Sequence, residues 1–419
     1  MELGKLFSPY TMGHFQLPHR IVMAPLTRMR SGPCQVPTLL NAEYYAQRAS
    51  AALIIGEATY VAPEGYGYCN SPGIVSDEQV EGHKLLTQAV HDKGGLFFLQ
   101  LWHVGRISHP SMQPQGQLPV APSGIAPKDV NAATHMGRLP IPTPRSLTTS
   151  EIQSMVVEPF RKAACNARRA HYDGVEIHAA NGYLLEQFLS DGTNHRTDQY
   201  GGNIENRFRV LREVCTAVID AWDGDGRRVG VRLSPSGTFN DMADSDWMSH
   251  WTYIVRELDK LGLAYLHVVE PRIDGSADRY TDRETKISTT WRKTWRNIWS
   301  GTLIGAGGYT RRTAEAALRN KDLDLVCFGR KFISNPDLPA RFAAAARSDA
   351  GQREASREQG RRGSNDKGFH TEEGEIGGEE REEDDDDVSF LNPYERETFY
   401  GGGAQGYTDY PFWKKGETS

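Results

Sequence analysis

Three polar side chains of different chemistry follow one short apolar run of the chain. His178, Asn181 and Tyr183 come directly after residues 174–177, Gly-Val-Glu-Ile, which have the composition of a buried strand. An imidazole and a carboxamide can donate hydrogen bonds to one oxygen atom, and a phenol can supply a proton. This set can polarise a carbonyl or nitro group and protonate the carbon beside it. Alone, His178 is typical of a core histidine and Tyr183 of a packed aromatic residue, so the case depends on their clustering.

Seven more apolar runs are suited to buried parallel strands, and helical segments separate them. With Val175–Ile177 they make eight: Ile21–Ala24, Leu53–Ile55, Leu96–Leu101, Val229–Leu233, Tyr265–Val269, Leu303–Ile304 and Leu325–Phe328. Helix starts are indicated by capping residues, which are Ser76 with Gln79, Thr148 with Glu151, Thr310, and Asn335 before Pro336. The alternation predicts an α/β protein with a (β/α)8 barrel. A doubly wound sheet is the alternative, and it is disfavoured because no G-x-G-x-x-G opens a helix after an early strand.

The chain divides into three predicted parts. Residues 1–346 form the barrel, and the Pro/Gly-rich stretch Ser108–Arg145 is an excursion after the third strand that covers the barrel mouth as a hairpin lid. Residues 347–388 are rich in Gly, Arg, Glu and Asp, and we expect them to be disordered because they have little apolar surface to bury. They serve as a solvated linker or as an interaction tail whose partner the sequence does not name. Residues 389–419 are aromatic again and return to the barrel.

Composition limits the possible partners and compartments. Residues 371–387 carry eleven acidic side chains and one basic one, Arg381, so the remainder of a chain of net charge −6 is only weakly basic, at about +4. This charge suits an anionic small ligand and does not favour nucleic acid. Five scattered cysteines without a C-x-x-C pair, and no apolar stretch long enough for a membrane, predict a cytoplasmic protein. His103 and His109 lack a metal-ligand spacing, so no metal site is expected.

Polar or small residues recur where the predicted strands end, which is where barrel enzymes place their chemistry. Gly307-Gly308 and Gly329-Arg330 follow the seventh and eighth strands, the usual phosphate site of barrels. Glycines let backbone N–H groups approach an anion, and Arg330 offers a two-pronged clamp. The alternative is that the two glycines at 307 and 308 only make a tight turn.

Arg232 lies in an otherwise apolar strand, so it needs an anionic partner. Either a structural carboxylate, Glu176 or Glu57, or the electron-rich edge of a bound cofactor can fill that need. Gln100 and Thr27 are neutral groups suited to the edge of a heteroaromatic ring, and each is equally suited to satisfying backbone in the core.

The order of several long motifs resembles the old yellow enzymes, flavin-dependent ene-reductases on a (β/α)8 barrel. The resemblance covers residues 3–346 and 389–413. The matching segments include residues 23–28 (MAPLTR), 100–106 (QLWHVGR), 178–188, 198–207 (DQYGGNIENR), 231–235 (VRLSP), 328–330 (FGR), 333–338, 399–403 (FYGGG) and 406–411. The acidic stretch is an insertion relative to this family and puts the placement of Tyr400 in doubt. Position 27 is Thr rather than Cys, which resembles the classical subgroup of the family.

The resemblance implies FMN as a non-covalent cofactor and a role for each matching residue. Pro25, Thr27, Ala58, Gln100 and Arg232 are expected around the flavin ring, and Gly307, Gly308, Gly329 and Arg330 around its phosphate. His178 and Asn181 are expected to bind the substrate's activating oxygen, and Tyr183 to deliver the proton. Trp102 and Tyr400 are expected to line the substrate pocket.

The reaction implied is the reduction of an α,β-unsaturated aldehyde, ketone or nitroalkene, with NADPH or NADH as the source of hydride. A flavin-dependent isomerase or a redox step of a biosynthetic pathway is an alternative on the same scaffold. A non-catalytic flavoprotein scaffold would bind FMN without turnover, and a flavin-free lyase barrel would be colourless.

Overall fold

The computed structural model describes residues 3–271, 273–274, 277–278, 290–363 and 388–414. Eight parallel strands close into a barrel in the order β10-β11-β12-β15-β16-β3-β4-β5. Closure confirms the predicted (β/α)8 barrel and excludes the doubly wound sheet, which stays open. Along the chain the strands are β3 (Ile21–Met23), β4 (Leu53–Tyr60), β5 (Phe97–Trp102), β10 (Gly174–Ala179), β11 (Val229–Leu233), β12 (Tyr265–Val269), β15 (Thr302–Ala306) and β16 (Leu325–Phe328).

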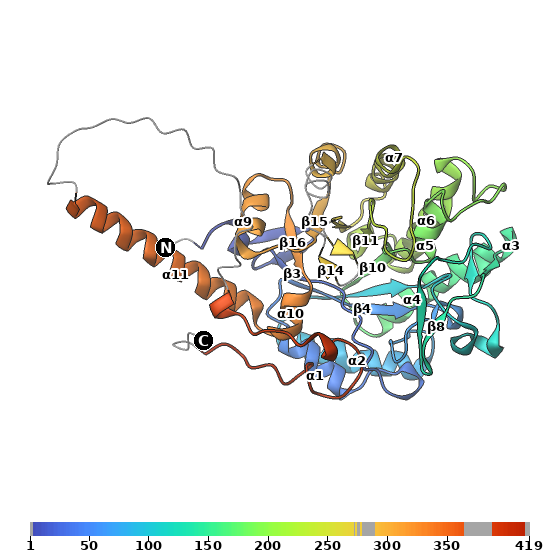
Figure 1. Cartoon of the computed structure of the whole chain (residues 1–419), viewed down its shortest axis with the longest axis horizontal. Coiled ribbons are helices and arrows are strands. Elements are labelled where there is room, and N and C mark those ends of the chain that lie inside the picture. The colour runs from blue at the N-terminus through green and yellow to red at the C-terminus, as the bar shows by residue number, and fades with distance from the viewer. Residues whose placement is uncertain (1–2, 272, 275–276, 279–289, 364–387, 415–419) are drawn as a thin grey trace.

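Helices follow the strands and surround the barrel (Figure 1). Those with bounds in the described residues are α1 (Leu39–Gln47), α2 (Asp77–His91), α3 (Thr149–Ile152), α4 (Glu158–Arg169), α5 (Leu184–Leu189), α6 (Ile204–Ala221), α7 (Trp247–Asp259), α9 (Arg311–Arg319), α10 (Arg330–Ser334) and α11 (Leu338–Gly363). The predicted capping boxes of α2 and α3 are present, and the Thr310 hydroxyl caps α9. These caps satisfy backbone N–H groups that the first helical turn leaves without partners.

Two antiparallel hairpins cover the two ends of the barrel. The pair β1 (Tyr10–Met12) and β2 (Phe15–Leu17) packs its buried residues against the barrel residues Val22 and Phe98. The pair β7 (Asn131–Thr134) and β8 (Gly137–Pro140) lies in the excursion after β5. Its buried Ala132 belongs to the same apolar cluster as Trp102 and Tyr183. The predicted hairpin over the mouth is therefore present.

Asn335 does not cap the helix that follows it, contrary to the prediction. It ends α10, its side chain donates to the Lys331 carbonyl at 2.8 Å, and α11 begins three residues later at Leu338. The helix α11 then continues to Gly363 and projects away from the barrel (Figure 1). Residues 347–363, part of the stretch predicted to be disordered, lie in this helix. The acidic stretch itself lies outside the described residues.

The terminal residues 388–414 pack against the barrel. The Tyr407 ring stacks on Tyr44 of α1 with centroids 4.1 Å apart, and the Asn392 N–H donates to Asn335 Oδ1 at 2.7 Å. Figure 1 shows this segment running beside α1. No helix of the described ranges combines the length and the apolar character needed to cross a bilayer.

Candidate active site at the barrel mouth

Strand register places the predicted polar residues at neighbouring positions of the barrel wall. His178 of β10 is level with Arg232 of β11, and Arg232 is level with His267 of β12. Two residues before His178 in β10, Glu176 is level with Gln100 of β5. The carboxyl ends of parallel strands lie at the same end of a barrel, so these side chains share one mouth.

His178, Tyr183 and Trp102 form an aromatic cluster there. The Tyr183 ring lies edge-on to Trp102 and to His178, with centroid distances of 4.9 and 5.1 Å. All three side chains are buried, and the indole Nε1 of Trp102 finds no hydrogen-bond partner in the described part of the chain. The structure thus brings His178 and Tyr183 of the predicted set together, with Trp102 beside them.

The His178 ring is held in one tautomer. Its Nδ1 accepts a hydrogen bond from the Ala180 N–H at 3.3 Å. Burial, and then the nearby charges of Arg232 and His267, hold the pKa of His178 well below its ordinary value. A neutral imidazole whose Nδ1 accepts carries its proton on Nε2, so His178 can donate from Nε2 to a substrate oxygen.

Tyr183 is a buried phenol with a hydrogen-bonded hydroxyl. It donates to the hydroxyl of Tyr68 at 3.0 Å. Burial raises the pKa of Tyr183 well above its ordinary value, while a hydrogen bond from the Asn240 side chain opposes the rise. Tyr183 therefore keeps its proton at neutral pH and has two polar neighbours for its oxygen.

Hydrogen bonds with Ser234 and Asn240 hold the loop of residues 180–183. Asn181 has a left-handed backbone (φ 57°), its N–H donates to Ser234 Oγ at 2.7 Å, and its carbonyl accepts from Asn240 Nδ2 at 2.8 Å. Ser234 Oγ in turn donates to the buried Glu186 carboxyl at 3.0 Å. These contacts orient the short turn from β10 into α5, while the Asn181 side chain is half-buried.

A buried charged chain runs along the barrel wall below His178. Glu176 accepts from Gln100 Nε2 at 2.7 Å and lies 2.8 Å from His267 Nδ1. Burial would raise the pKa of Glu176, but His267, Arg232 and Gln100 together lower it. Among the residues that the structure describes, the buried Arg232 Nε has no hydrogen-bond partner, so Glu176 does not accept from this donor.

The remaining predicted cofactor residues surround the same end of the barrel. Ala58 is buried in β4 beside Trp102, and Pro25 and Thr27 follow β3, Pro25 buried and Thr27 half-buried. A Cβ on Gly329 would lie 3.4 Å from Leu26, so the end of β16 reaches the loop after β3. Gly307 and Gly308 have positive φ (150° and 64°), and they follow β15, the strand paired with β16. Glycine adopts positive φ without steric cost, and both a tight turn and an anion-binding loop use this conformation.

Tyr400 is half exposed and sits near the two hydroxyls of the mouth. The residue is 52% accessible, and after burial its phenol is one of the neighbouring groups that raise the pKa of Tyr68 and of Tyr183. Sequence reasoning missed Tyr68 and Asn240. Tyr68 follows the second strand, and Asn240 follows the fifth, so their place after strand ends is the signal that identifies them.

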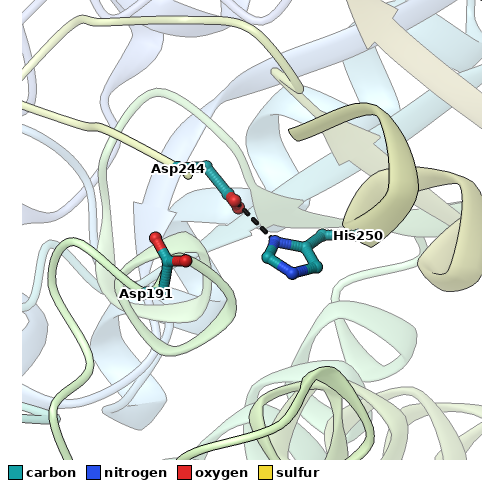
Figure 2. A group of neighbouring side chains, drawn as sticks. All are labelled: Asp191, Asp244 and His250. Carbon is teal, nitrogen blue, oxygen red and sulfur yellow. Dashed lines mark hydrogen bonds and ion pairs between the residues drawn. The ribbon is translucent and has the colours of Figure 1, made fainter. Parts of the chain in front are cut away.

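Among the described residues, one group outside this cluster brings possible metal-ligand atoms together. Asp191, Asp244 and His250 have ligand atoms within 4.8 Å of one another, and Figure 2 shows His250 turned toward Asp244. Their atoms already have protein partners, because Asp191 accepts from the Ser245 N–H at 3.0 Å and Arg207 Nη2 lies 3.1 Å from His250 Nδ1. The cationic Arg207 is unfavourable for a metal ion, so we interpret the group as a tie between the α5 end and the loop before α7.

Comparison with known proteins identifies the family. A family model described as the NADH:flavin oxidoreductase / NADH oxidase family matches residues 5–349. The chain belongs to this family. Its relatives include a putative 12-oxophytodienoate reductase 11 of Oryza sativa subsp. japonica, 40% identical over 97% of both chains, and the flavin oxidoreductase hxnT of Emericella nidulans, 39% identical over 98% of both.

Solved structures agree with the old yellow enzyme fold. Morphinone reductase in complex with tetrahydroNAD superposes with a TM-score of 0.81, at 42% identity and 98% coverage of each chain. The old yellow enzyme homologue of Zymomonas mobilis has the same TM-score at 39% identity, covering 97% of this chain and 99% of its own. As a member of the old yellow enzyme family, this protein is an oxidoreductase that uses FMN and a reduced nicotinamide.

The residues at the mouth fit FMN. The free, buried Nε of Arg232 offers a cationic donor, and the neutral Gln100 offers hydrogen-bonding groups on the neighbouring wall. The glycines at positions 307, 308 and 329 have no side chain to obstruct a phosphate at the loops after β15 and β16. No described residue of the site contradicts the group.

Proposed function

We propose that this old yellow enzyme reduces the activated C=C bond of α,β-unsaturated carbonyl or nitro compounds, with NADPH or NADH as reductant. Bound FMN would supply the hydride-transfer chemistry that links the nicotinamide to the substrate's β-carbon. The observation that carries the proposal is the contact of a neutral His178 with the buried, hydrogen-bonded Tyr183 at one strand end.

His178 and Asn181 act on the substrate's activating oxygen. The Nε2–H of His178 and the side-chain amide of Asn181 donate to this oxygen and stabilise the negative charge that develops on it. The tautomer set by Ala180 and the backbone contacts of Asn181 fix both groups before substrate arrives. Such preorganisation lowers the barrier because no donor has to reorient during reaction.

Tyr183 delivers the proton to the α-carbon. Its hydroxyl is at the mouth, and Tyr68 and Asn240 are positioned to support its oxygen once the proton has left. Trp102 and Tyr400 enclose the substrate from two sides.

For the cofactor, we assign Pro25, Thr27, Ala58, Gln100 and Arg232 to the ring and Gly307, Gly308, Gly329 and Arg330 to the phosphate. The names of the relatives, reductases of an oxophytodienoate and of morphinone, support an unsaturated ketone as the substrate class.

The test is anaerobic turnover with purified protein. NADPH and NADH are each offered with 2-cyclohexen-1-one or a nitroalkene, and products are identified by mass. The proposal expects a product two hydrogens heavier and matching consumption of nicotinamide. A product of unchanged mass would indicate the isomerase alternative, and bound FMN without turnover would indicate a scaffold.

All five cysteines are free, which supports a cytoplasmic place for the reaction.

A further inference from the structure

Two buried arginines follow Thr27 and take no part in the site described above. Arg28 is fully buried and Arg30 is 6% accessible. A buried guanidinium must have its donors satisfied, because an unpaired charge away from water is costly. Most of their donors bind backbone carbonyls of one distant segment, residues 398–406, which we name the 398–406 loop. Arg28 Nη1 is buried and has no hydrogen-bond partner among the described residues.

The two guanidinium groups bind five carbonyls of that loop. Arg28 donates to Phe399 O at 2.9 Å and to Gly406 O at 2.7 Å. Arg30 donates to four carbonyls, with bonds of 2.8 to 3.3 Å to Thr398, Phe399, Gly403 and Gln405. In return, the Gly401 N–H donates to the Arg28 carbonyl at 3.0 Å. The backbone of this irregular loop is therefore hydrogen-bonded to the side chains of both arginines.

The rings of Tyr44 and Tyr407 also contact the two guanidinium groups. The guanidinium carbon of Arg28 lies 5.1 Å from the Tyr44 ring centroid and 5.0 Å from that of Tyr407, and Arg30 lies 4.6 Å from Tyr407. Arg30 also donates to the Arg28 carbonyl at 3.1 Å. Cation–π contact and this internal bond leave the pair little freedom.

Tyr400 lies at the centre of the bound loop. Its preceding residue, Phe399, gives its carbonyl to both arginines, and its following residue, Gly401, is bound to the Arg28 carbonyl. Arg28 itself follows Thr27 directly. The backbone on both sides of Tyr400 is therefore tied to the segment that carries Thr27, so the two sides of the mouth are linked by hydrogen bonds.

We propose that Arg28 and Arg30 are positioning residues that hold Tyr400 over the barrel mouth and thereby set the affinity for the unsaturated substrate. This inference rests on the proposed function, because Tyr400 is assigned there to the substrate pocket. The arginines act through the 398–406 loop and touch neither substrate nor cofactor.

The principal test is Arg30→Met, which keeps a long apolar side chain but removes the donors. We expect the KM for 2-cyclohexen-1-one to rise about 10-fold or more, since displaced positioning residues have effects of this order. The rate at which NADPH bleaches the bound FMN should change less than about twofold. Arg30→Lys should fall between, because a single ammonium group cannot reach four carbonyls in a fork geometry.

Arg20→Met is the matched control. Arg20 is also buried and also donates to backbone carbonyls, to Asp324 O at 2.9 Å, but it precedes β3 at the opposite end of the barrel. It should lower Tm without changing KM. If Arg30→Met lowers Tm but leaves KM unchanged, as Arg20→Met does, the arginines are only structural and the inference fails.

A double-mutant cycle with Tyr400→Ala tests the route of the effect. If Arg30 acts through Tyr400, the KM changes of the two variants should not add, and Arg30→Met should have little effect in the Tyr400→Ala background. Full additivity would overturn the inference. A Tyr400→Ala variant of normal KM would instead remove Tyr400 from the substrate pocket, which is a failure of the proposed function.

Gly406→Ala disturbs the loop without changing either arginine. Gly406 has φ of 62°, and a Cβ there would lie within 2 Å of the Thr398 hydroxyl, so the loop must shift. This variant should reproduce the raised KM with normal flavin reduction, and it replaces Arg30→Met if that protein does not retain FMN. A normal KM in Gly406→Ala would contradict the inference.

Discussion

Burial shifts the pKa values of His178 and Tyr183 in opposite directions. It holds the pKa of His178 well below its ordinary value and raises the pKa of Tyr183 well above its own. Both residues are therefore neutral over a wide range, His178 as a donor from Nε2 and Tyr183 as an acid. This is the protonation state that the proposed reaction needs from each.

The pH profile of alkene reduction follows from these shifts. An acid with a raised pKa loses its proton only above the ordinary value, and an imidazole with a lowered pKa becomes charged only below its ordinary value. We therefore expect kcat to be nearly flat between about pH 6.5 and about pH 10, the unperturbed values for the two groups. The measurement is kcat against pH at saturating substrate. A limb inside this window that disappears in Tyr183→Phe or His178→Gln would contradict the account.

Residue types at this scale could be predicted, but their partners could not. The cluster of His178, Asn181 and Tyr183 follows from one strand end of the sequence. Tyr68 lies 115 positions from Tyr183, and Asn240 follows another strand, so only closure of the barrel brings them to the same hydroxyl. The free Nε of Arg232 likewise depends on register, because His178 and His267 flank it from neighbouring strands.

At the scale of elements, the turn from β10 into α5 depends on a buried carboxyl. Glu186 accepts from the Gly182 N–H and from Ser234 Oγ, and burial raises its pKa to about 8. A carboxyl with a raised folded-state pKa stabilises the protein at low pH and loses this contribution as pH rises to about 8.

Replacing Glu186 by Gln should remove this pH dependence. The difference in Tm between Glu186→Gln and the unmodified protein should move in favour of the variant as pH rises from about 5 to about 8.5. Thermal unfolding at several pH values measures it, and Glu205→Gln, in the first turn of the exposed α6 start, is the control. A difference that does not change with pH would show that Glu186 is already ionised in the fold.

Strand positions could be predicted because parallel barrel strands are continuous apolar runs, whereas element ends could not. The strand β4 extends to Tyr60, beyond the predicted Ile55, across an irregularity between Gly56 and Thr59 that carries Ala58 toward the mouth. Asn335 has the sequence signal of a helix start but ends a helix, because its amide finds the Lys331 carbonyl behind it. Local patterns do not reveal which of two adjacent helices a polar side chain will serve.

At the scale of the whole molecule, the terminal segment is part of the barrel's packing. Tyr407 is fully buried, stacks on Tyr44 and lies beside Arg28 and Arg30. The sequence predicted a return to the barrel from the aromatic residues alone, and the arginine contacts that secure it follow from no periodic pattern.

Tyr407→Ala should therefore destabilise the entire fold. Loss of a fully buried aromatic side chain costs about 3–5 kcal/mol, which denaturant unfolding with a fixed m-value can measure. Phe412→Ala, at a side chain 49% exposed, is the control and should stay within about 0.5 kcal/mol. Equal effects of the two substitutions would mean that the terminal segment is not held as described.

The most direct test of the account is to measure the two half-reactions separately in Tyr183→Phe. Stopped-flow absorbance follows bleaching of the flavin by NADPH and, in a second mixing, its recovery with 2-cyclohexen-1-one. We predict that the recovery slows by about 10²–10⁴-fold, the usual contribution of a positioned acid, while bleaching stays close to the unmodified rate. Recovery at the unmodified rate would show that Tyr183 does not deliver the proton, and the assignment of this mouth as an alkene-reducing site would lose its central residue.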